Sequence, residues 1–239
     1  MILQLDMGNS RIKWRLKLAG QSLSQGAATY DVCWQTPLCK QVPDALWVSC
    51  VAPDKQRAAL IDSCDRWQWP RPQFATTGEC FGRLRNGYTH PGKLGVDRWL
   101  ALIAAAARVG DKPCVVVDSG SALTVDIIDA GGCHQGGYIA PGVASMHRAL
   151  TNAAPELAGL ATTEAYTDLP GKSTAEAIDA AIGAMGAGLI ARALALAATP
   201  KTGPDCLLTG GDARVWVQYV KSAQVVPDLV LDGLQRYFA

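Results

Sequence analysis

Two segments of the chain share one arrangement of hydrophobic and polar positions, and each predicts a β-hairpin. In the first, the apolar run at residues 2–5 ends at Asp6, a small-residue turn follows, and residues 11–18 alternate strictly between apolar and charged. Strict alternation is typical of a strand with one buried and one solvated face. We therefore expect one set of side chains to face the core (Ile12, Trp14, Leu16 and Leu18) and the other to face solvent (Arg11, Lys13, Arg15 and Lys17).

The second segment, at residues 115–128, repeats this arrangement. An apolar strand ends at Asp118, Gly120 and Ser121 turn the chain, and an alternating strand follows. A third glycine turn, Gly210 and Gly211, also follows a short apolar strand. A repeated motif predicts a duplicated unit. We expect an α/β fold of two halves, 1–110 and 111–239, with the two similar loops facing one cleft.

The rest of the pattern predicts the following elements. Residues 19–44 are expected to be irregular, and polar loops are expected at 78–93 and 160–172. Strands are expected at 46–51, 73–76, 114–118, 122–129, 133–140 and 206–209. Helices are expected at 53–67, 94–108 (with Leu100, Ile103, Ala104 and Ala107 on its buried face), 142–150, 212–222 and from Pro227 onward.

The clearest helix start in the chain lies at residue 173. Ser173 followed by Glu176 forms a capping-box pattern. Thr174 either offers its hydroxyl to a ligand or sits in the cap, and the pattern favours the cap. The same helix continues into an Ala/Gly-rich stretch at 180–198, which is long enough for a membrane span but fits a helix packed inside a soluble protein better. Its small residues suit a dimer surface and burial within the monomer equally.

Composition narrows the class of partner. With 49% hydrophobic residues and a formal net charge of +1, the chain can form a full core but has no long-range field that would favour nucleic acid or an anionic membrane. Eight scattered cysteines without a Cys-x-x-Cys pair suggest reduced thiols, and the N-terminus does not resemble a signal peptide, so we expect a cytoplasmic protein. The three histidines show no metal-ligand spacing and are expected at the surface or in loops (His90, His134 and His147).

Two features of these segments suggest anion chemistry. Backbone N–H groups in a turn of small residues bind anions, and Asp6 beside the first turn suits a hydrated Mg²⁺ that contacts phosphate. Asp97 and Arg98 fall in the first turn of the predicted helix at 94–108. A carboxylate is favoured there by the helix dipole, whereas the adjacent Arg indicates an anionic ligand.

The ordered set of motifs resembles one family, the type III pantothenate kinases of bacterial coenzyme A synthesis, within the actin, hexokinase and heat-shock chaperone ATPase superfamily. The resemblance covers nearly the whole chain and rests on these residues, in the family's order: Asp6, Gly8, Asn9, Ser10 and Lys13; Asn86, Gly87 and Tyr88; Leu94, Gly95, Asp97 and Arg98; Asp118, Gly120, Ser121, Ala122, Thr124 and Asp126; Gly136, Gly137, Tyr138, Ile139, Pro141 and Gly142; Ser173 and Thr174; Gly210, Gly211 and Asp212.

The resemblance implies duplicated ribonuclease H-like halves, a homodimer, and a role for each matching residue. ATP would contact the first loop and Ser121 (Asp6, Met7, Gly8, Asn9, Ser10, Arg11, Ile12, Lys13 and Ser121). Asp118 would hold the monovalent cation, K⁺ or NH₄⁺. Pantothenate would contact a separate set in which Asp97 is the proton acceptor (Tyr88, Gly95, Val96, Asp97, Arg98 and Thr174). Ser121 replaces the family's usual Thr; because the hydroxyl is kept, we expect ATP binding to survive.

The implied activity is transfer of phosphate from ATP, with Mg²⁺, to pantothenate. Two alternatives share the expected fold. A regulatory nucleotide-binding protein that assists transcription would keep both loops but need no acceptor base, and the combination of Tyr88, Asp97 and Arg98 favours the enzyme. Another small-molecule kinase of the superfamily would share all of the ATP-binding residues, and only a screen of acceptors would separate it.

Overall fold

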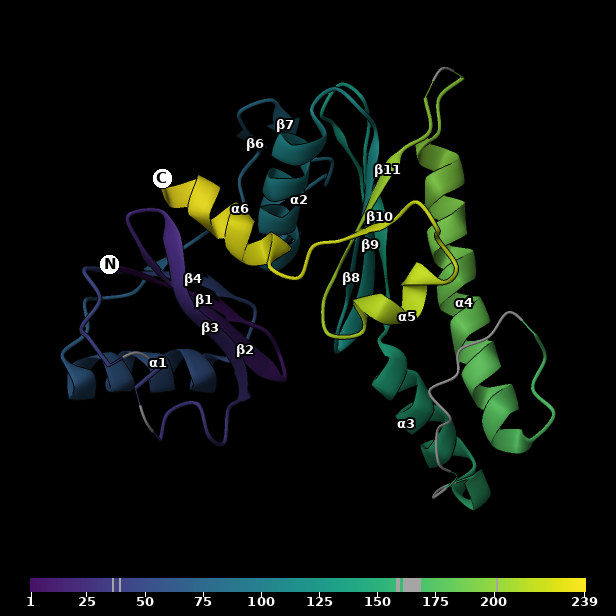
Figure 1. Cartoon of the computed structure of the whole chain (residues 1–239), viewed down its shortest axis with the longest axis horizontal. Coiled ribbons are helices and arrows are strands. Elements are labelled where there is room, and N and C mark those ends of the chain that lie inside the picture. Colours follow the sequence, from purple (N-terminus) through teal and green to yellow (C-terminus); the bar gives the residue numbers. More distant parts are fainter. Residues whose placement is uncertain (36, 39, 158–159, 161–168, 201) are drawn as a thin grey trace. The chain divides into compact units, whose positions relative to one another are not determined.

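Two five-stranded mixed sheets with the same strand order form the centre of the fold in the computed structural model (Figure 1). The first sheet has the order β3-β2-β1-β4-β5 and the second has the order β10-β9-β8-β11-β12. In each sheet, the first three strands in sequence pair antiparallel, the fourth pairs parallel with the first, and the fifth pairs parallel with the fourth. The predicted duplication into two mixed sheets flanked by helices is confirmed.

The structure describes residues 1–35, 37–38, 40–157, 160, 169–200 and 202–239. They divide into two compact units, each treated by itself. Unit 1 contains Met1–Phe81, Tyr88–Ala104 and Asp228–Ala239, and unit 2 contains Gly82–Gly87 and Ala105–Pro227. The units are therefore not continuous in sequence, and the division into ATPase-like halves at residue 110 stays a prediction. The loop predicted at 160–172 lies largely outside the described residues.

Unit 1 is built on the first sheet. Its strands are β1 (Ile2–Met7), β2 (Arg11–Leu18), β3 (Gln21–Thr29), β4 (Ala45–Cys50) and β5 (Gln73–Phe74). Its helices are α1 (Asp54–Trp67), the 3₁₀ turn η1 (Pro91–Lys93) and α6 (Leu229–Phe238), and α2 (Val96–Val109) begins in it. The short strand β6 (Cys80–Phe81) also belongs to unit 1, whereas β7 (Leu84–Arg85) belongs to unit 2.

Unit 2 is built on the second sheet. Its strands are β8 (Cys114–Ser119), β9 (Ala122–Ile128), β10 (His134–Pro141), β11 (Asp205–Thr209) and β12 (Gln224–Val225). Its helices are α3 (Val143–Ala153), the 3₁₀ turn η2 (Pro155–Leu157), α4 (Thr174–Ala197) and α5 (Ala213–Val217). The predicted helix at 212–222 is therefore shorter than expected, because β12 follows it closely, and β12 itself was not predicted.

The two faces of β1 have different coverings, and Figure 1 shows α1 and α6 on the two sides of this sheet. Leu3 and Leu5 pack in one apolar cluster with Leu60 and Cys64 of α1. Gln4 points the opposite way and donates to the side chain of Gln235 on α6 at 3.0 Å. A helix from the far end of the chain therefore completes the first sheet.

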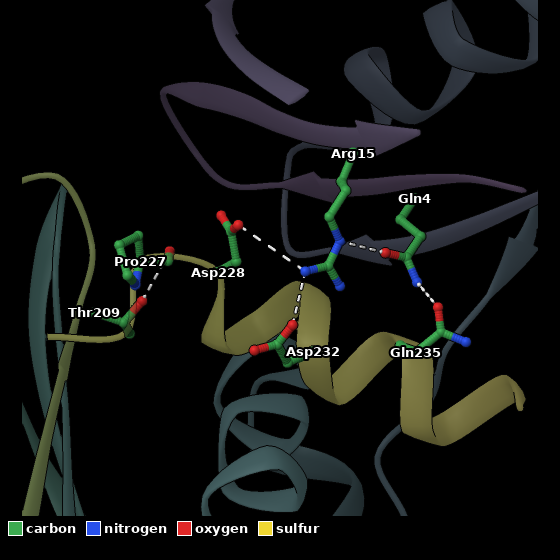
Figure 2. A network of polar contacts seen from close by, with 7 residues as sticks. All are labelled: Gln4, Arg15, Thr209, Pro227, Asp228, Asp232 and Gln235. Carbon is green, nitrogen blue, oxygen red and sulfur yellow. Dashed lines mark hydrogen bonds and ion pairs between the residues drawn. The ribbon is translucent and has the colours of Figure 1, made fainter. Parts of the chain in front are cut away.

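The solvated face predicted for β2 is wrong at Arg15. Its side chain is buried because α6 covers it, and it donates to Gln4 across the strand at 2.9 Å and to Asp232 of α6 at 2.7 Å (Figure 2). Leu18, predicted to face the core, is half exposed at the end of the strand. Local alternation predicted the strand correctly but could not reveal which later element would cover each face.

Residues 19–44 are not irregular throughout, because β3 occupies Gln21–Thr29. This strand is rich in Ser, Gln, Gly and Ala and lies at the edge of the sheet, paired antiparallel with β2. Small polar residues give a weak strand signal, so pairing with β2 rather than intrinsic propensity accounts for it.

The core of unit 2 lies between the second sheet and its helices. Val117 and Val125 pack in one cluster with Ile190 of α4 and Trp216 of α5, and Figure 1 shows α4 running alongside this sheet. The predicted capping box is confirmed, since Glu176 N–H donates to Ser173 Oγ at 3.3 Å and Ser173 N–H donates back to the Glu176 carboxylate at 3.1 Å. Helix α4 is long and apolar enough to cross a membrane by composition, but its contacts with β8 and β9 fit a helix packed in a folded unit.

Two smaller expectations about burial are also wrong. His134 is buried at the start of β10, where its Nε2 lies 2.8 Å from Asp126 of β9. His147 on α3 is partly buried, with Nε2 3.1 Å from the buried Asp179 of α4. Ala107, predicted on the buried face of its helix, is exposed. Sequence spacing does not reveal the two histidine–aspartate pairs, because each pair joins two separate elements.

Candidate active site

The first candidate loop connects β1 and β2 in unit 1. Asp6 lies opposite Lys13 on β2 and beside Ser49 on β4. The Gly8 N–H donates to the carbonyl of Arg11 at 3.0 Å, which closes the turn. Three of the predicted ATP-binding residues are exposed at its tip (Asn9, Ser10 and Arg11).

Two predicted members of this loop differ from the others. Met7 and Ile12 pair across the hairpin, and both side chains are fully buried in the apolar cluster of unit 1. Their side chains hold the hairpin on the core, so only their backbone groups are available to the predicted ligand. The tight turn and its exposed tip fit the anion-binding role predicted for the loop.

The second group of predicted residues lies at the start of α2. The Asp97 carboxylate accepts the Arg98 N–H at 2.8 Å, and the Trp99 N–H donates to the carbonyl of Gly95 at 2.9 Å. A Cβ at position 95 would lie 2.6 Å from Asp97 Oδ1, so glycine is required for the carboxylate to occupy this position. The predicted first-turn placement of Asp97 and Arg98 is confirmed.

Tyr88 and Arg98 contact each other, although ten residues separate them. The guanidinium of Arg98 donates to the Tyr88 hydroxyl at 2.7 Å, and its Cζ lies 5.5 Å from the centroid of the Tyr88 ring. The Arg98 side chain belongs to a residue that is only 7% exposed. The contact with Tyr88 fixes the direction of the Arg98 guanidinium, and the planar N–H groups of a guanidinium match carboxylate and phosphate oxygens.

Val51 connects these two groups within unit 1. Its N–H donates to the carbonyl of Met7 at 3.0 Å, and its Cγ1 lies 4.0 Å from the position of a Cβ at Gly95. The end of β1 and the start of α2 are therefore neighbours through one residue that follows β4. Sequence reasoning missed Val51, because an apolar residue after a buried strand carries no chemical signal of its own.

The second candidate loop connects β8 and β9 in unit 2. Asp118 lies between Thr124 on β9 and Thr209 on β11. Gly210 has φ = +93°, and a Cβ there would lie 2.5 Å from Asp118 Oδ1, so the third glycine turn rests directly against this carboxylate. The turn containing Gly210 and Gly211 therefore belongs to the surroundings of Asp118.

Ser121 is exposed at the tip of this second loop. Its carbonyl accepts the Gly142 N–H at 3.2 Å and the Ser145 hydroxyl at 3.0 Å, and both donors belong to the start of α3. A Cβ at Gly142 would lie 1.9 Å from the carbonyl oxygen of Gly120. The start of α3 thus fixes the loop backbone and leaves the Ser121 hydroxyl at the surface.

Thr174 is exposed at the first position of α4 in unit 2. Ser173 and Glu176 complete the cap by themselves, so the cap does not require the Thr174 hydroxyl. The predicted site residues are thus divided between the units. Asp6 to Lys13, Tyr88 and Gly95 to Arg98 lie in unit 1, and Asp118, Ser121 and Thr174 lie in unit 2.

Within the described residues, no group of three or more His, Cys, Asp or Glu side chains could hold a metal ion. Asp6 and Asp118 are single carboxylates, each partly exposed near the end of a strand that leads into a tight turn. A single hard oxygen donor suits a cation that is also held by waters or by the phosphates of a nucleotide. The donor chemistry at these two positions therefore fits Mg²⁺ or K⁺ bound together with a nucleotide.

Solved structures with the same fold define the class. A Campylobacter jejuni protein, described as a conserved candidate Baf family transcriptional activator, matches with a TM-score of 0.68 at 21% identity, over 99% of this chain and 96% of that one. A candidate 2-dehydro-3-deoxygalactonokinase from Sinorhizobium meliloti matches with a TM-score of 0.50 at 13% identity, over 98% and 97%. At these identities the likeness shows the fold alone, which is the actin/hexokinase-like ATPase fold.

Sequence comparison identifies the family within this class. The model of type III pantothenate kinases matches residues 2–195. A type III pantothenate kinase of Cellvibrio japonicus is 35% identical over 100% of this chain and 97% of its own length. That of Pseudomonas aeruginosa strain LESB58 is 36% identical over 98% and 97%. The chain belongs to the type III pantothenate kinase family.

Proposed function

We propose that this protein transfers the γ-phosphoryl group of ATP to the primary hydroxyl of pantothenate, which gives 4′-phosphopantothenate in the first step of coenzyme A biosynthesis. One observation carries the proposal: a full-length match to the family coincides with an ordered group at the start of α2, in which Arg98 contacts Tyr88 and its N–H binds Asp97. Phosphoryl transfer depends mainly on positioning and charge neutralisation, and this group supplies positioning for an acceptor.

Asp97 is the proposed proton acceptor. Its carboxylate is anchored through one oxygen by the Arg98 N–H, in the first turn of a helix. In this role it orients the substrate hydroxyl and takes its proton late in the transfer. Arg98 pairs with the substrate carboxylate or a nearby carboxylate, while Tyr88, Gly95, Val96 and Thr174 complete the pantothenate contacts.

ATP is proposed to bind the first loop, residues 6–13, together with Ser121 of the second loop. The N–H groups at the exposed tip of the first loop bind phosphate oxygens, and Lys13 adds a positive charge beside Asp6. The Asp6 carboxylate is the proposed protein ligand of Mg²⁺, and the Asp118 carboxylate is the proposed protein ligand of K⁺ or NH₄⁺. When bound, these cations neutralise the charge of the triphosphate.

A homodimer in the cytoplasm is the proposed state of the protein. Helix α4 has an exposed face of small or apolar residues (Ala181, Ala184, Met185, Gly188 and Leu196). An apolar groove of about 380 Å³ lies along α4 between Ala184 and Tyr219. Small residues let two helices approach closely, so a second copy of the chain is the proposed occupant. A monomeric sedimentation profile at micromolar concentration would rule out the dimer.

An ATP-consumption assay tests the proposed function most directly. We expect ATP hydrolysis or transfer to require pantothenate and to rise on addition of K⁺ in the presence of Mg²⁺. Consumption with a sugar or acetate but not with pantothenate would indicate a different small-molecule kinase of this fold. Nucleotide binding without consumption in the presence of any acceptor would favour a regulatory protein.

A further inference from the structure

A tyrosine that the family resemblance does not include contacts the backbone of the first loop. Tyr30 directly follows β3, and its hydroxyl donates to the carbonyl of Gly8 at 2.7 Å. The strand register explains this reach: Thr29, the last residue of β3, pairs with Arg11 at the start of β2. The next residue therefore lies beside the turn between β1 and β2.

The position of the Tyr30 side chain is fixed on more than one side. The residue is partly buried, and its ring packs against the apolar cluster of unit 1. Burial, together with the nearby Cys50 and Asp6, raises the pKa of the Tyr30 hydroxyl well above its ordinary value. A tyrosine is protonated at neutral pH even at its ordinary pKa of about 10, so the hydroxyl is a hydrogen-bond donor to Gly8.

The hydrogen bond to Gly8 determines the direction of the next N–H group. The described chain contains no cis peptide bonds, so the Gly8 C=O and the Asn9 N–H point in opposite directions across one planar unit. Because the Gly8 carbonyl is held toward Tyr30, the Asn9 N–H points away from Tyr30. Asn9 is exposed at the tip of the loop, where the proposed function places the phosphates.

We propose that Tyr30 is a positioning residue of the nucleotide loop, which holds the Gly8 carbonyl so that the Asn9 N–H is directed at the triphosphate of ATP. The inference rests on the proposed function, because it assigns the ligand of the same loop. Tyr30 does not touch the reacting atoms. Its effect is to pre-organise a backbone donor, which lowers the cost of ordering the loop when phosphate binds.

The test compares Tyr30→Phe with Tyr237→Phe. Both substitutions remove one hydroxyl from unit 1. Tyr237 belongs to α6, and its hydroxyl lies 3.1 Å from Thr76 Oγ1. Removal of one neutral hydrogen bond predicts that Tyr30→Phe raises the KM for ATP, and the Kd for inorganic tripolyphosphate, about three- to tenfold. The KM for pantothenate and the Kd for AMP should stay within about twofold, and Tyr237→Phe should change none of these values.

A second readout does not depend on activity. In amide NMR spectra, titration with tripolyphosphate should shift the Asn9 N–H of the wild-type protein, and the same titration should shift it less in Tyr30→Phe at equal ligand concentration. A merely structural role for Tyr30 would instead lower the melting temperature while both ligand affinities stay at their wild-type values, and that result would overturn the inference.

The outcomes separate this inference from the proposed function. Wild-type protein that binds ATP and phosphorylates pantothenate, with an unchanged ATP affinity in Tyr30→Phe, would overturn the inference alone. An equal loss of ATP affinity in Tyr237→Phe would also overturn it, because the effect would then not be specific to the loop. Wild-type protein that binds neither ATP nor tripolyphosphate would overturn both.

Discussion

Arg15 on β2 lies 2.7 Å from Asp232 on α6, so a residue of the first hairpin is paired with one that lies 217 residues later in the sequence. Asp228 lies further from the same guanidinium, at 4.0 Å, and Gln4 accepts from its Nε (Figure 2). A buried guanidinium therefore depends on the docking of α6 for most of its partners.

This pairing predicts that Asp232→Ala destabilises unit 1. The substitution removes the nearest carboxylate from a buried cation, so we expect the free energy of unfolding to fall by about 1–2 kcal/mol, less than for a fully buried pair because Asp232 is partly exposed. Urea unfolding measures the change. The control is Asp65→Ala, which breaks the exposed pair with Arg71 and should change stability by less than about 0.5 kcal/mol. Equal effects would contradict the role given to α6.

The role proposed for Asp97 predicts a loss of turnover without a loss of ATP binding. Asp97→Asn keeps the shape of the side chain but removes the base, so kcat should fall by a factor on the order of 10²–10⁴ while the Kd for ATP stays near the wild-type value. Steady-state kinetics and direct ATP titration give the two numbers. Nearly full activity in this variant would exclude Asp97 as the proton acceptor.

Gly95 provides a second test of the same carboxylate. A Cβ at position 95 would lie 2.6 Å from Asp97 Oδ1, so Gly95→Ala should displace the carboxylate and lower kcat/KM for pantothenate by about tenfold or more. Gly92→Ala is the matched control, because nothing lies within 4 Å of a Cβ at position 92. Pantothenate kinetics that are the same in both variants would show that the position of Asp97 does not depend on Gly95.

Two glycines of α4 should respond in opposite directions to alanine. A Cβ at Gly186 would lie 2.3 Å from the ring of the buried Trp216, whereas a Cβ at Gly188 meets nothing within 4 Å. In the separated monomer, where the proposed dimer contact is absent, Gly188→Ala should raise the free energy of unfolding by up to about 1 kcal/mol through helix propensity. Gly186→Ala should lower it, because overpacking typically costs about 1–3 kcal/mol. The thermal midpoints of the two variants should therefore move to opposite sides of the wild-type value.

Buried thiols predict a loss of stability at alkaline pH. Burial raises the pKa of Cys64 to about 11 and that of Cys206 to about 12. A group whose pKa is raised in the folded state stabilises fully below its unfolded pKa, which is roughly 8.5 for Cys, and loses that contribution as the pH rises toward the folded value. The urea midpoint should thus be flat from about pH 7 to 8 and fall above about pH 9.

Cys64→Ala isolates the contribution of one thiol. This variant should show a shallower fall of the urea midpoint above pH 9, because one group no longer titrates on unfolding. Cys80→Ala is the control, since Cys80 is exposed. An identical pH dependence in all three proteins would show that ionisation of the buried Cys64 is not linked to unfolding.

Local patterns predicted the parts of the fold whose signal lies within one element. The hairpins after Asp6 and Asp118, the duplication and the cap at Ser173 all follow from short-range spacing, and the structure confirms them. That both loops bind the same ATP molecule stays a prediction. The errors involve long-range partners: Arg15 is covered by α6, and His134 pairs with Asp126 on the neighbouring strand.

The candidate site shows the same division. The sequence placed Tyr88 and Arg98 among the same expected substrate contacts, but it could not predict that they contact each other. Their hydrogen bond depends on how the chain before α2 folds back. Tyr30 and Val51 could not be anticipated at all. Tyr30 donates to the carbonyl of Gly8 and Val51 donates to the carbonyl of Met7. A backbone carbonyl is present at every position, so a sequence motif cannot indicate such a partner.

Because α6 belongs to the first sheet, unit 1 cannot be completed until the whole of unit 2 has been synthesised. The strands of unit 1 are translated before unit 2, but the helix that covers Gln4 and Arg15 is translated after every strand of unit 2. A nascent chain must therefore carry a sheet with one uncovered face, and a charged guanidinium on it, until α6 emerges. Deletion of residues from α6 would consequently destabilise the strands that are made early rather than the segment that directly precedes the helix.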